Sequence, residues 1–289
     1  MTGTLLPHAS ERTMYITDEQ LQDYRRDGFL LIPSVFSPAE VQAMKAELPG
    51  VFAEDSPARV MEKETGVVRS VYGSHRTHDV FARMVRDPRL LVPSQAVVGD
   101  DVYVHQFKIN AKLAFRGEVW EWHQDYIFWR NEDGFPAADV VTVALFLDEV
   151  NEFNGPLLFV PGSQRDGVIE PRARKTGGEG EPSWKADVSA ALSYTVQQDT
   201  LAELVARGGI VAPKGPAGSV LFFDGNVVHG SAPNMSPFDR MLALVTYNAV
   251  SNVPRLREKP RPEFLCSRDF TALAPLETAP TAERELSAI

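Results

Sequence analysis

The chain has one cysteine, Cys266, among its 289 residues, and it has no long apolar run. A single cysteine excludes an internal disulfide framework and a thiolate-rich zinc site, and it is typical of proteins from a reducing cytoplasm. A membrane helix needs about 20 consecutive apolar residues, and no segment approaches that length. We therefore expect a cytoplasmic protein with no membrane partner.

Basic residues are outnumbered by acidic ones. The chain has 29 Lys and Arg and 39 Asp and Glu, which give a formal net charge of −10. Nucleic acid is excluded as a main partner, since phosphate binding needs clustered cations. A small anionic ligand needs only one or two local cations and is still allowed. Residues 1–16 lack the basic start and apolar core of a signal peptide, so we expect a loose leader there. No feature of the sequence specifies an oligomeric state.

Two stretches of different character predict the fold. Residues 17–100 hold capped, periodic segments that predict helices, beginning with a capping box at Thr17 and another helix start at Ser37. Residues 101–250 alternate short β-prone runs with turn residues, which is typical of antiparallel sandwiches and barrels. We predict one domain over 1–289, mainly β, in which a helical N-terminal third supports a cupin-like double-stranded β-helix, or jelly roll, and residues 251–289 form a peripheral tail.

The expected strands share apolar or alternating runs bounded by Gly, Pro, Asn or Asp. They cover residues 29–32, 102–111, 119–128, 140–150, 157–160, 168–170, 219–223 and 241–249. A short helix is expected over 199–207, and the glycine-rich insert 172–182 is expected to be a mobile loop.

The most informative stretch is Trp-Glu-Trp-His-Gln-Asp-Tyr, residues 120–126. His123 and Asp125 are two residues apart, and alternate side chains of a β-strand leave the same face. The pair would supply two ligands of the 2-His-1-carboxylate face that holds non-haem iron(II). Two polar residues on a surface strand, or a histidine satisfied in the core, are the alternatives. The surrounding aromatic residues argue against simple solvation, and buried polar groups need partners.

Two later residues complete the set. His229 follows a strongly apolar strand and stands at a turn, where functional residues collect. Arg240, eleven residues further on, opens another apolar strand. An arginine in that position usually reaches solvent, but a cavity for iron(II) and a dicarboxylate co-substrate needs a fixed guanidinium fork. Together with His123 and Asp125, these residues are far more specific than any one of them.

At these residues the sequence resembles the iron(II)/2-oxoglutarate dioxygenases of the phytanoyl-CoA dioxygenase superfamily, above all the bacterial free L-proline 4-hydroxylases. The similar segments are 101–112, 122–129, 154–162, 229–231 and 261–265. Ectoine hydroxylases are more distant relatives on the same framework. The resemblance implies that His123, Asp125 and His229 bind iron(II), and that Arg240 holds the distal carboxylate of 2-oxoglutarate.

Further site residues follow from the same resemblance. It implies Asn110, Thr142 and Ser231 around the co-substrate, and Gln106 and Trp129 on the substrate side. On a strand, Gln106 would also share one face with Lys108, Asn110 and Lys112, which would form a polar row lining a cavity. A solvated sheet face is the alternative for that row.

The resemblance implies hydroxylation of a small-molecule amino acid with iron(II), 2-oxoglutarate and O2, and L-proline to 4-hydroxyproline is the best prediction. The carboxylate of a free amino acid needs a cation, for which Arg76, Arg116 and Arg130 are candidates. The alternatives are an ectoine-like or pipecolate-like substrate, a cupin-like metalloenzyme that does not use 2-oxoglutarate, and a non-catalytic binding protein.

Overall fold

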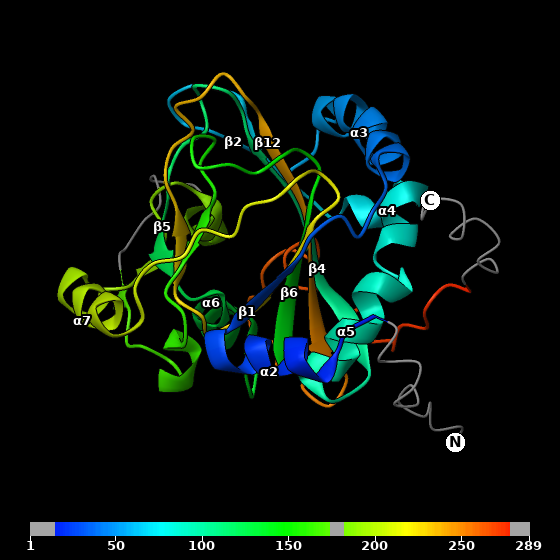
Figure 1. Cartoon of the computed structure of the whole chain (residues 1–289). Helices are drawn as coiled ribbons and strands as arrows, with labels where there is room; N and C mark the ends of the chain where they lie inside the picture. Colours follow the sequence, from blue (N-terminus) through cyan, green and yellow to red (C-terminus); the bar gives the residue numbers. More distant parts are fainter. Residues whose placement is uncertain (1–14, 174–181, 278–289) are drawn as a thin grey trace, which may run out of the picture.

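The structure is a computed structural model, and it describes residues 15–173 and 182–277 (Figure 1). The leader expected over residues 1–16 lies outside the described residues except for Tyr15 and Ile16, and Ile16 is buried in the core. The insert 172–182, expected to be a mobile loop, also lies outside them except at its ends.

Two antiparallel sheets form the body of the molecule. Among the described residues, seven strands make the larger sheet, in the order β1-β10-β6-β12-β4-β3-β2, and three make the smaller one, in the order β5-β11-β7. The strands of the larger sheet are β1 (Phe29–Ile32), β2 (Arg59–Met61), β3 (Val68–Tyr72), β4 (Val102–Lys112), β6 (Val140–Phe146), β10 (Val220–Asp224) and β12 (Arg240–Ala249). Those of the smaller sheet are β5 (Trp120–His123), β7 (Leu157–Phe159) and β11 (His229–Ser231). Phe159 packs against Leu221 and Phe223 of the larger sheet, so the sheets share a core. The predicted mainly-β jelly roll is confirmed.

Helices pack against the larger sheet (Figure 1). They are α2 (Asp18–Asp27), α3 (Pro38–Ala53), α4 (Asp79–Met84) and α5 (Pro88–Val98). Capping boxes at Thr17 and Ser37 begin α2 and α3 as the sequence predicts. Val41 of α3 and Leu90 of α5 belong to one buried cluster with Val143 of the sheet. The helical support therefore completes the hydrophobic core.

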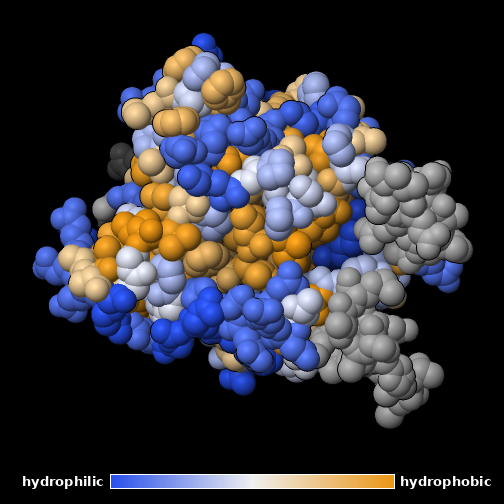
Figure 2. Space-filling model, in the orientation of Figure 1, coloured by the Kyte–Doolittle hydropathy of each residue, from blue (hydrophilic) through white to orange (hydrophobic). Residues whose placement is uncertain are grey.

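The outer side of α2 shows how these helices meet solvent. Leu21 and Tyr24 are buried, whereas the surface over α2 is hydrophilic in Figure 2. Among the described residues, no helix combines the length and the apolar character needed to cross a bilayer.

Residues 17–100 contribute strands as well as helices, and the strand expected over residues 29–32 is present as β1. β1 forms one edge of the larger sheet by pairing with β10, and β3 and β2 extend the other edge beyond β4. These short strands pair with the edge strands of the jelly roll. Without them, the backbone N–H and C=O groups of those edge strands would lack hydrogen-bond partners.

The strand expected over residues 119–128 is wrong beyond His123. The chain leaves the sheet there and forms one helical turn, α6 (Asp125–Phe128), followed by a π-helical turn over Trp129–Asp133. A run of buried aromatic residues suits a buried strand and a buried turn equally, so periodicity alone assigns the wrong element.

Three other boundaries differ from the sequence prediction. β6 ends at Phe146, and Val150 makes only an isolated bridge with Gly215. No strand forms over residues 168–170; instead a two-residue strand, β8 (Arg172–Ala173), pairs with β9 (Tyr194–Thr195). His229 lies in strand β11 rather than in a turn. The helix expected over 199–207 is present as α7 (Gln198–Gly208).

The tail predicted as peripheral over residues 251–289 is not peripheral in its described part. Arg261, Leu265 and Cys266 are buried, and Ser267 N–H donates to the His105 carbonyl of β4. This segment returns to the jelly roll because an ion pair and an apolar side chain find partners there. It therefore forms part of the wall around the site.

Candidate metal centre

His123, Asp125 and His229 meet at one point on the smaller sheet. Strand pairing sets His123 directly opposite His229, with ring centroids 4.3 Å apart. Asp125, the first residue of α6, places Oδ1 3.5 Å from His123 Nε2 and Oδ2 3.9 Å from His229 Nε2. One donor atom from each residue lies within 4.8 Å of the others. Two imidazoles and one carboxylate in this arrangement are the donor set of non-haem iron(II).

The two imidazole rings are oriented by backbone carbonyls. His123 Nδ1 lies 2.6 Å from the Glu121 carbonyl oxygen, and His229 Nδ1 lies 3.0 Å from that of Val227. A carbonyl only accepts, so each Nδ1 carries the hydrogen and each Nε2 keeps its lone pair toward Asp125. This is the tautomer that a metal-binding histidine needs.

Burial also sets the protonation state of the site. It lowers the pKa of His229 to about 4, and His123 acts in the same direction. Burial alone would raise the pKa of Asp125, but Lys108 and the two histidines hold it well below its ordinary value. The group therefore presents a carboxylate beside neutral imidazole at pH 7, as a divalent cation requires. The residues fit iron(II).

A cavity on one side of the triad ends at a buried guanidinium, and we call it the Arg240 cavity. Besides the triad it is lined by Lys108, Asn110, Trp120, Leu157, Phe223, Arg240 and Leu244. Arg240 Nη2 donates to the Gly155 carbonyl at 2.9 Å and to Ser231 Oγ at 3.3 Å. Its Nε has no hydrogen-bond partner among the described residues. Burial lowers the pKa of Arg240 to about 10, so it is still charged at pH 7. A buried cation with an unused donor fits a carboxylate.

A buried lysine, Lys112, stands beside Arg240. Lys112 Nζ donates to Ser231 Oγ at 2.6 Å, and Ser231 Oγ donates to the Gly155 carbonyl at 2.9 Å. Burial lowers the pKa of Lys112 well below its usual range, and Arg240 adds to that effect. The polar row expected on β4 faces the interior, since Lys112 is buried and the other three members line cavities.

A second cavity also borders the triad, and we call it the Arg261 cavity. Besides the triad residues His123 and Asp125 it is lined by Tyr72, Gln106, Lys108, Trp120, Phe128, Trp129, Asp187, Val188, Leu192 and Arg261. Gln106 is fixed there by donating from Nε2 to the Leu265 carbonyl at 2.8 Å. The two cavities are narrow, about 30 Å³ here and about 20 Å³ at Arg240, so each accepts a compact ligand only when bordering side chains shift.

Several site residues expected from the sequence do not line either cavity. Arg116, expected to bind substrate, is exposed in the turn after β4, and Arg76 and Arg130 are exposed as well. The structure does not bring these three arginines to the wall of either cavity. Thr142 is buried, but its hydroxyl pairs with Thr246 at 3.2 Å instead of facing the Arg240 cavity.

The sequence reasoning missed Arg261 and Asp187 as cavity residues. Arg261 begins the segment 261–265, which resembles the tail of the proline hydroxylases, and this similarity is the sequence signal that points to it. Asp187 lies in a short 3-10 turn, Ser183–Val188, with no motif around it. Only the fold brings it to the cavity.

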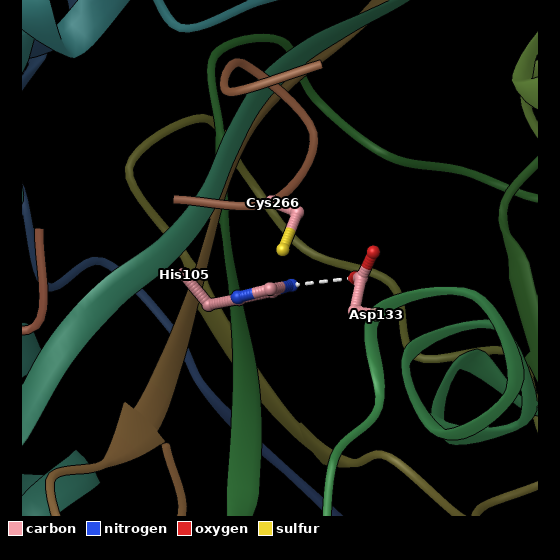
Figure 3. A group of neighbouring side chains, drawn as sticks. All are labelled: His105, Asp133 and Cys266. Carbon is pink, nitrogen blue, oxygen red and sulfur yellow. Dashed lines mark hydrogen bonds and ion pairs between the residues drawn. The ribbon is translucent and has the colours of Figure 1, made fainter. Parts of the chain in front are cut away.

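A second group of buried side chains also offers metal-binding atoms: His105, Asp133 and Cys266 (Figure 3). Asp133 already accepts from Arg261 Nε at 2.8 Å and Nη2 at 2.7 Å, and from His105 Nε2 at 3.0 Å. Burial, with Asp133 adding, raises the pKa of Cys266 to about 12, so the thiol keeps its proton. Because a guanidinium occupies the carboxylate, we assign this group to holding Arg261 rather than a metal.

Comparison with known proteins gives a consistent result. The family model for phytanoyl-CoA dioxygenase (PhyH) matches residues 24–242. An L-proline trans-4-hydroxylase from Streptomyces griseoviridis is 40% identical over 254 residues, which cover 88% of this chain and 94% of that protein. An ectoine dioxygenase from Bordetella bronchiseptica is 36% identical over 278 residues, covering 93% of this chain and 88% of that protein.

Solved structures of EctD from S. alaskensis are also similar. The complex with 2-oxoglutarate and 5-hydroxyectoine has a TM-score of 0.78 at 32% identity, covering 96% of this chain and 92% of that chain. The form with bound Fe has a TM-score of 0.77 at the same identity and coverage.

Proposed function

This chain belongs to the phytanoyl-CoA dioxygenase family and is an iron(II)- and 2-oxoglutarate-dependent dioxygenase, and on that premise we propose that it hydroxylates a free amino acid. The proposed reaction converts L-proline to 4-hydroxyproline. The observation that carries the proposal is the buried Arg261, which lines a cavity with His123 and Asp125 that does not include Arg240. The similarity to an L-proline trans-4-hydroxylase supports the same substrate.

In this proposal His123, Asp125 and His229 hold iron(II). Iron(II) and 2-oxoglutarate, when bound, supply the oxygen activation that converts an unactivated C–H bond to C–OH, while 2-oxoglutarate is oxidised to succinate and carbon dioxide. Arg240 binds the distal carboxylate of the co-substrate through a guanidinium that burial has already stripped of water. Asn110 borders the same ligand, and Ser231 holds Arg240 by accepting from its Nη2.

The protein's own residues position the substrate. Arg261 binds the carboxylate of the amino acid, and Gln106 and Trp129 border its ring. Phe128, stacked edge-on against His123 with centroids 6.0 Å apart, keeps water from the metal side of this cavity. Holding the target carbon near the metal lowers the barrier, because the reacting atoms no longer have to be brought together from solution.

The test is succinate formation with iron(II), 2-oxoglutarate and O2 across L-proline, L-pipecolate and ectoine, with the product position read by NMR. We expect L-proline to give one succinate per hydroxylated product. Succinate formation that no free amino acid stimulates would contradict the amino acid proposal. Turnover without 2-oxoglutarate would point instead to the cupin-like alternative.

Ectoine is the second candidate substrate. The ectoine dioxygenases, 36% identical for the relative from Bordetella bronchiseptica, favour it, and like proline it carries a carboxylate beside a charged ring nitrogen. The same assay separates the two candidates, because the substrate with the higher kcat/KM is the one that the cavity fits.

A further inference from the structure

The Arg261 cavity contains a carboxylate that the proposed reaction does not yet use. Asp187 lines this cavity, and its side chain is only 5% exposed. One of its oxygens accepts from Ser193 Oγ at 2.6 Å. The other, Oδ2, lies 3.5 Å from Arg261 Nη1, which is long for a charge-assisted hydrogen bond. Asp187 is therefore oriented by Ser193 and holds Arg261 only loosely.

Arg261 has donors to spare on the same side. A guanidinium carries five N–H groups. Nε and Nη2 each donate to Asp133, and these two hydrogen bonds fix the plane of the guanidinium. Within the described part of the chain, the hydrogen bond found for Arg261 Nη1 is the long contact with Asp187, and both residues line the same cavity. Arg261 Nη1 and Asp187 Oδ2 are therefore a cationic donor and an anionic acceptor that lie side by side without a short hydrogen bond between them.

Such a pair matches one class of ligand. In an α-amino acid, a carboxylate and a protonated amine are carried by the same carbon, so both can meet neighbouring groups of opposite charge at once. A plain carboxylic acid would leave Asp187 buried beside a second negative group. An N-acylated amino acid would leave Asp187 without a cation. Both cases carry a desolvation cost that the zwitterion avoids.

We propose that Asp187 accepts a hydrogen bond from the charged amine of the substrate while Arg261 donates to its carboxylate, so that the cavity selects zwitterions with a free, protonated nitrogen next to the carboxylate. This inference rests on the proposed function and adds the group that rejects other carboxylates. Both L-proline and ectoine belong to the selected class, and uncharged analogues of the same shape do not.

The test compares binding of L-proline with that of tetrahydrofuran-2-carboxylate, in which an ether oxygen replaces the ring nitrogen. Dissociation constants are measured by calorimetry without oxygen, on protein loaded with Mn(II) and 2-oxoglutarate. Asp187→Asn should raise the Kd for L-proline by about 10- to 100-fold, the loss expected for one charge-assisted hydrogen bond. The same variant should bind the ether as well as the wild type does, or better.

Three controls sharpen the result. Asp187→Glu, which keeps the charge, should retain the preference for L-proline. Asp55→Asn, at a fully exposed carboxylate, should change neither Kd. The Kd for 2-oxoglutarate should be unchanged in Asp187→Asn, which shows that the variant is folded.

Two other outcomes overturn the inference in distinguishable ways. If the wild type binds L-proline and Asp187→Asn weakens both ligands equally, or neither, then Asp187 is only a structural partner of Arg261 and the proposed function stands. If the wild type binds no free amino acid of the panel, the amino acid function and the role of Asp187 both fall.

Discussion

The two cavities beside the triad differ in how their cations are balanced. At Arg240 and Lys112, no carboxylate among the described residues lies within ion-pair distance, and Arg240 Nε lacks a partner. At Arg261, by contrast, Asp133 lies 2.7 Å away and Asp187 3.5 Å away. Arg240 therefore has no ion-pair partner among the described residues and suits a carboxylate of a dianion such as 2-oxoglutarate. The Arg261 cavity is balanced and suits a zwitterion.

Removing the carboxylate between the cavities should have the largest effect. Asp125→Ala leaves two imidazoles, and we expect succinate formation to fall by at least about 1,000-fold because metal binding fails. Metal analysis after dialysis should show iron lost along with activity. Full activity in a variant that keeps no iron would contradict the role of the triad.

Changing the uncompensated cation should affect only one ligand. Arg240→Lys keeps the charge but loses the planar fork, and we expect the Kd for 2-oxoglutarate to rise by about 10- to 100-fold. The Kd for L-proline, measured on protein saturated with 2-oxoglutarate, should stay within twofold of the wild type. An equal rise in the Kd values for 2-oxoglutarate and L-proline would show that the two ligands do not bind in separate cavities.

Breaking the balanced cavity should affect stability as well as binding. Asp133→Asn leaves the buried Arg261 without its main counter-ion, and we expect a loss of about 3 kcal/mol in the free energy of unfolding. Binding of L-proline should weaken and binding of 2-oxoglutarate should not. Urea unfolding gives the first quantity, and Asp166→Asn, which breaks the exposed pair with Arg207, is the control that should change nothing measurable.

Lowering the pH should first weaken substrate binding in the Arg261 cavity. Burial raises the pKa of Asp187 to about 6, against the opposing effects of Arg261 and Ser193, while Glu132 and Asp133 raise it further. Its charge is therefore lost as the pH falls through about 6. The KM for L-proline should rise up to about tenfold per pH unit below that point, and Asp187→Asn should remove this limb of the profile. An unchanged limb in the variant would assign it to another group.

The smallest effect is expected at the second His, Asp and Cys group. The Cys266 thiol is buried and keeps its proton, so Cys266→Ala should leave the metal content and kcat unchanged and should lower stability only slightly. Loss of bound metal in this variant would contradict our assignment of that group to holding Arg261.

The sequence predicted the triad better than the element that carries it. His123 and Asp125 were expected to share a strand face, yet they meet because β5 ends and α6 begins between them. The short spacing is compatible with both geometries, so the pairing was correct although the local structure was wrong. Side-chain alternation on β4 was predictable because an eleven-residue strand keeps its period.

The substrate side could not be predicted in the same way. The sequence offers Arg116 only as one of three candidate cations for the substrate carboxylate, whereas Arg261 comes from a tail that was expected to be peripheral. Asp133 and Asp187 reach Arg261 from two turns, and no periodicity reports such contacts. Charge pairs between distant loops depend on the tertiary fold alone.

The most direct test is a crystal structure with Mn(II), 2-oxoglutarate and L-proline bound without oxygen. We expect the metal on His123, Asp125 and His229, the distal carboxylate of 2-oxoglutarate on Arg240, and the carboxylate of proline on Arg261. A metal bound elsewhere, or the two ligands in exchanged cavities, would contradict this expectation.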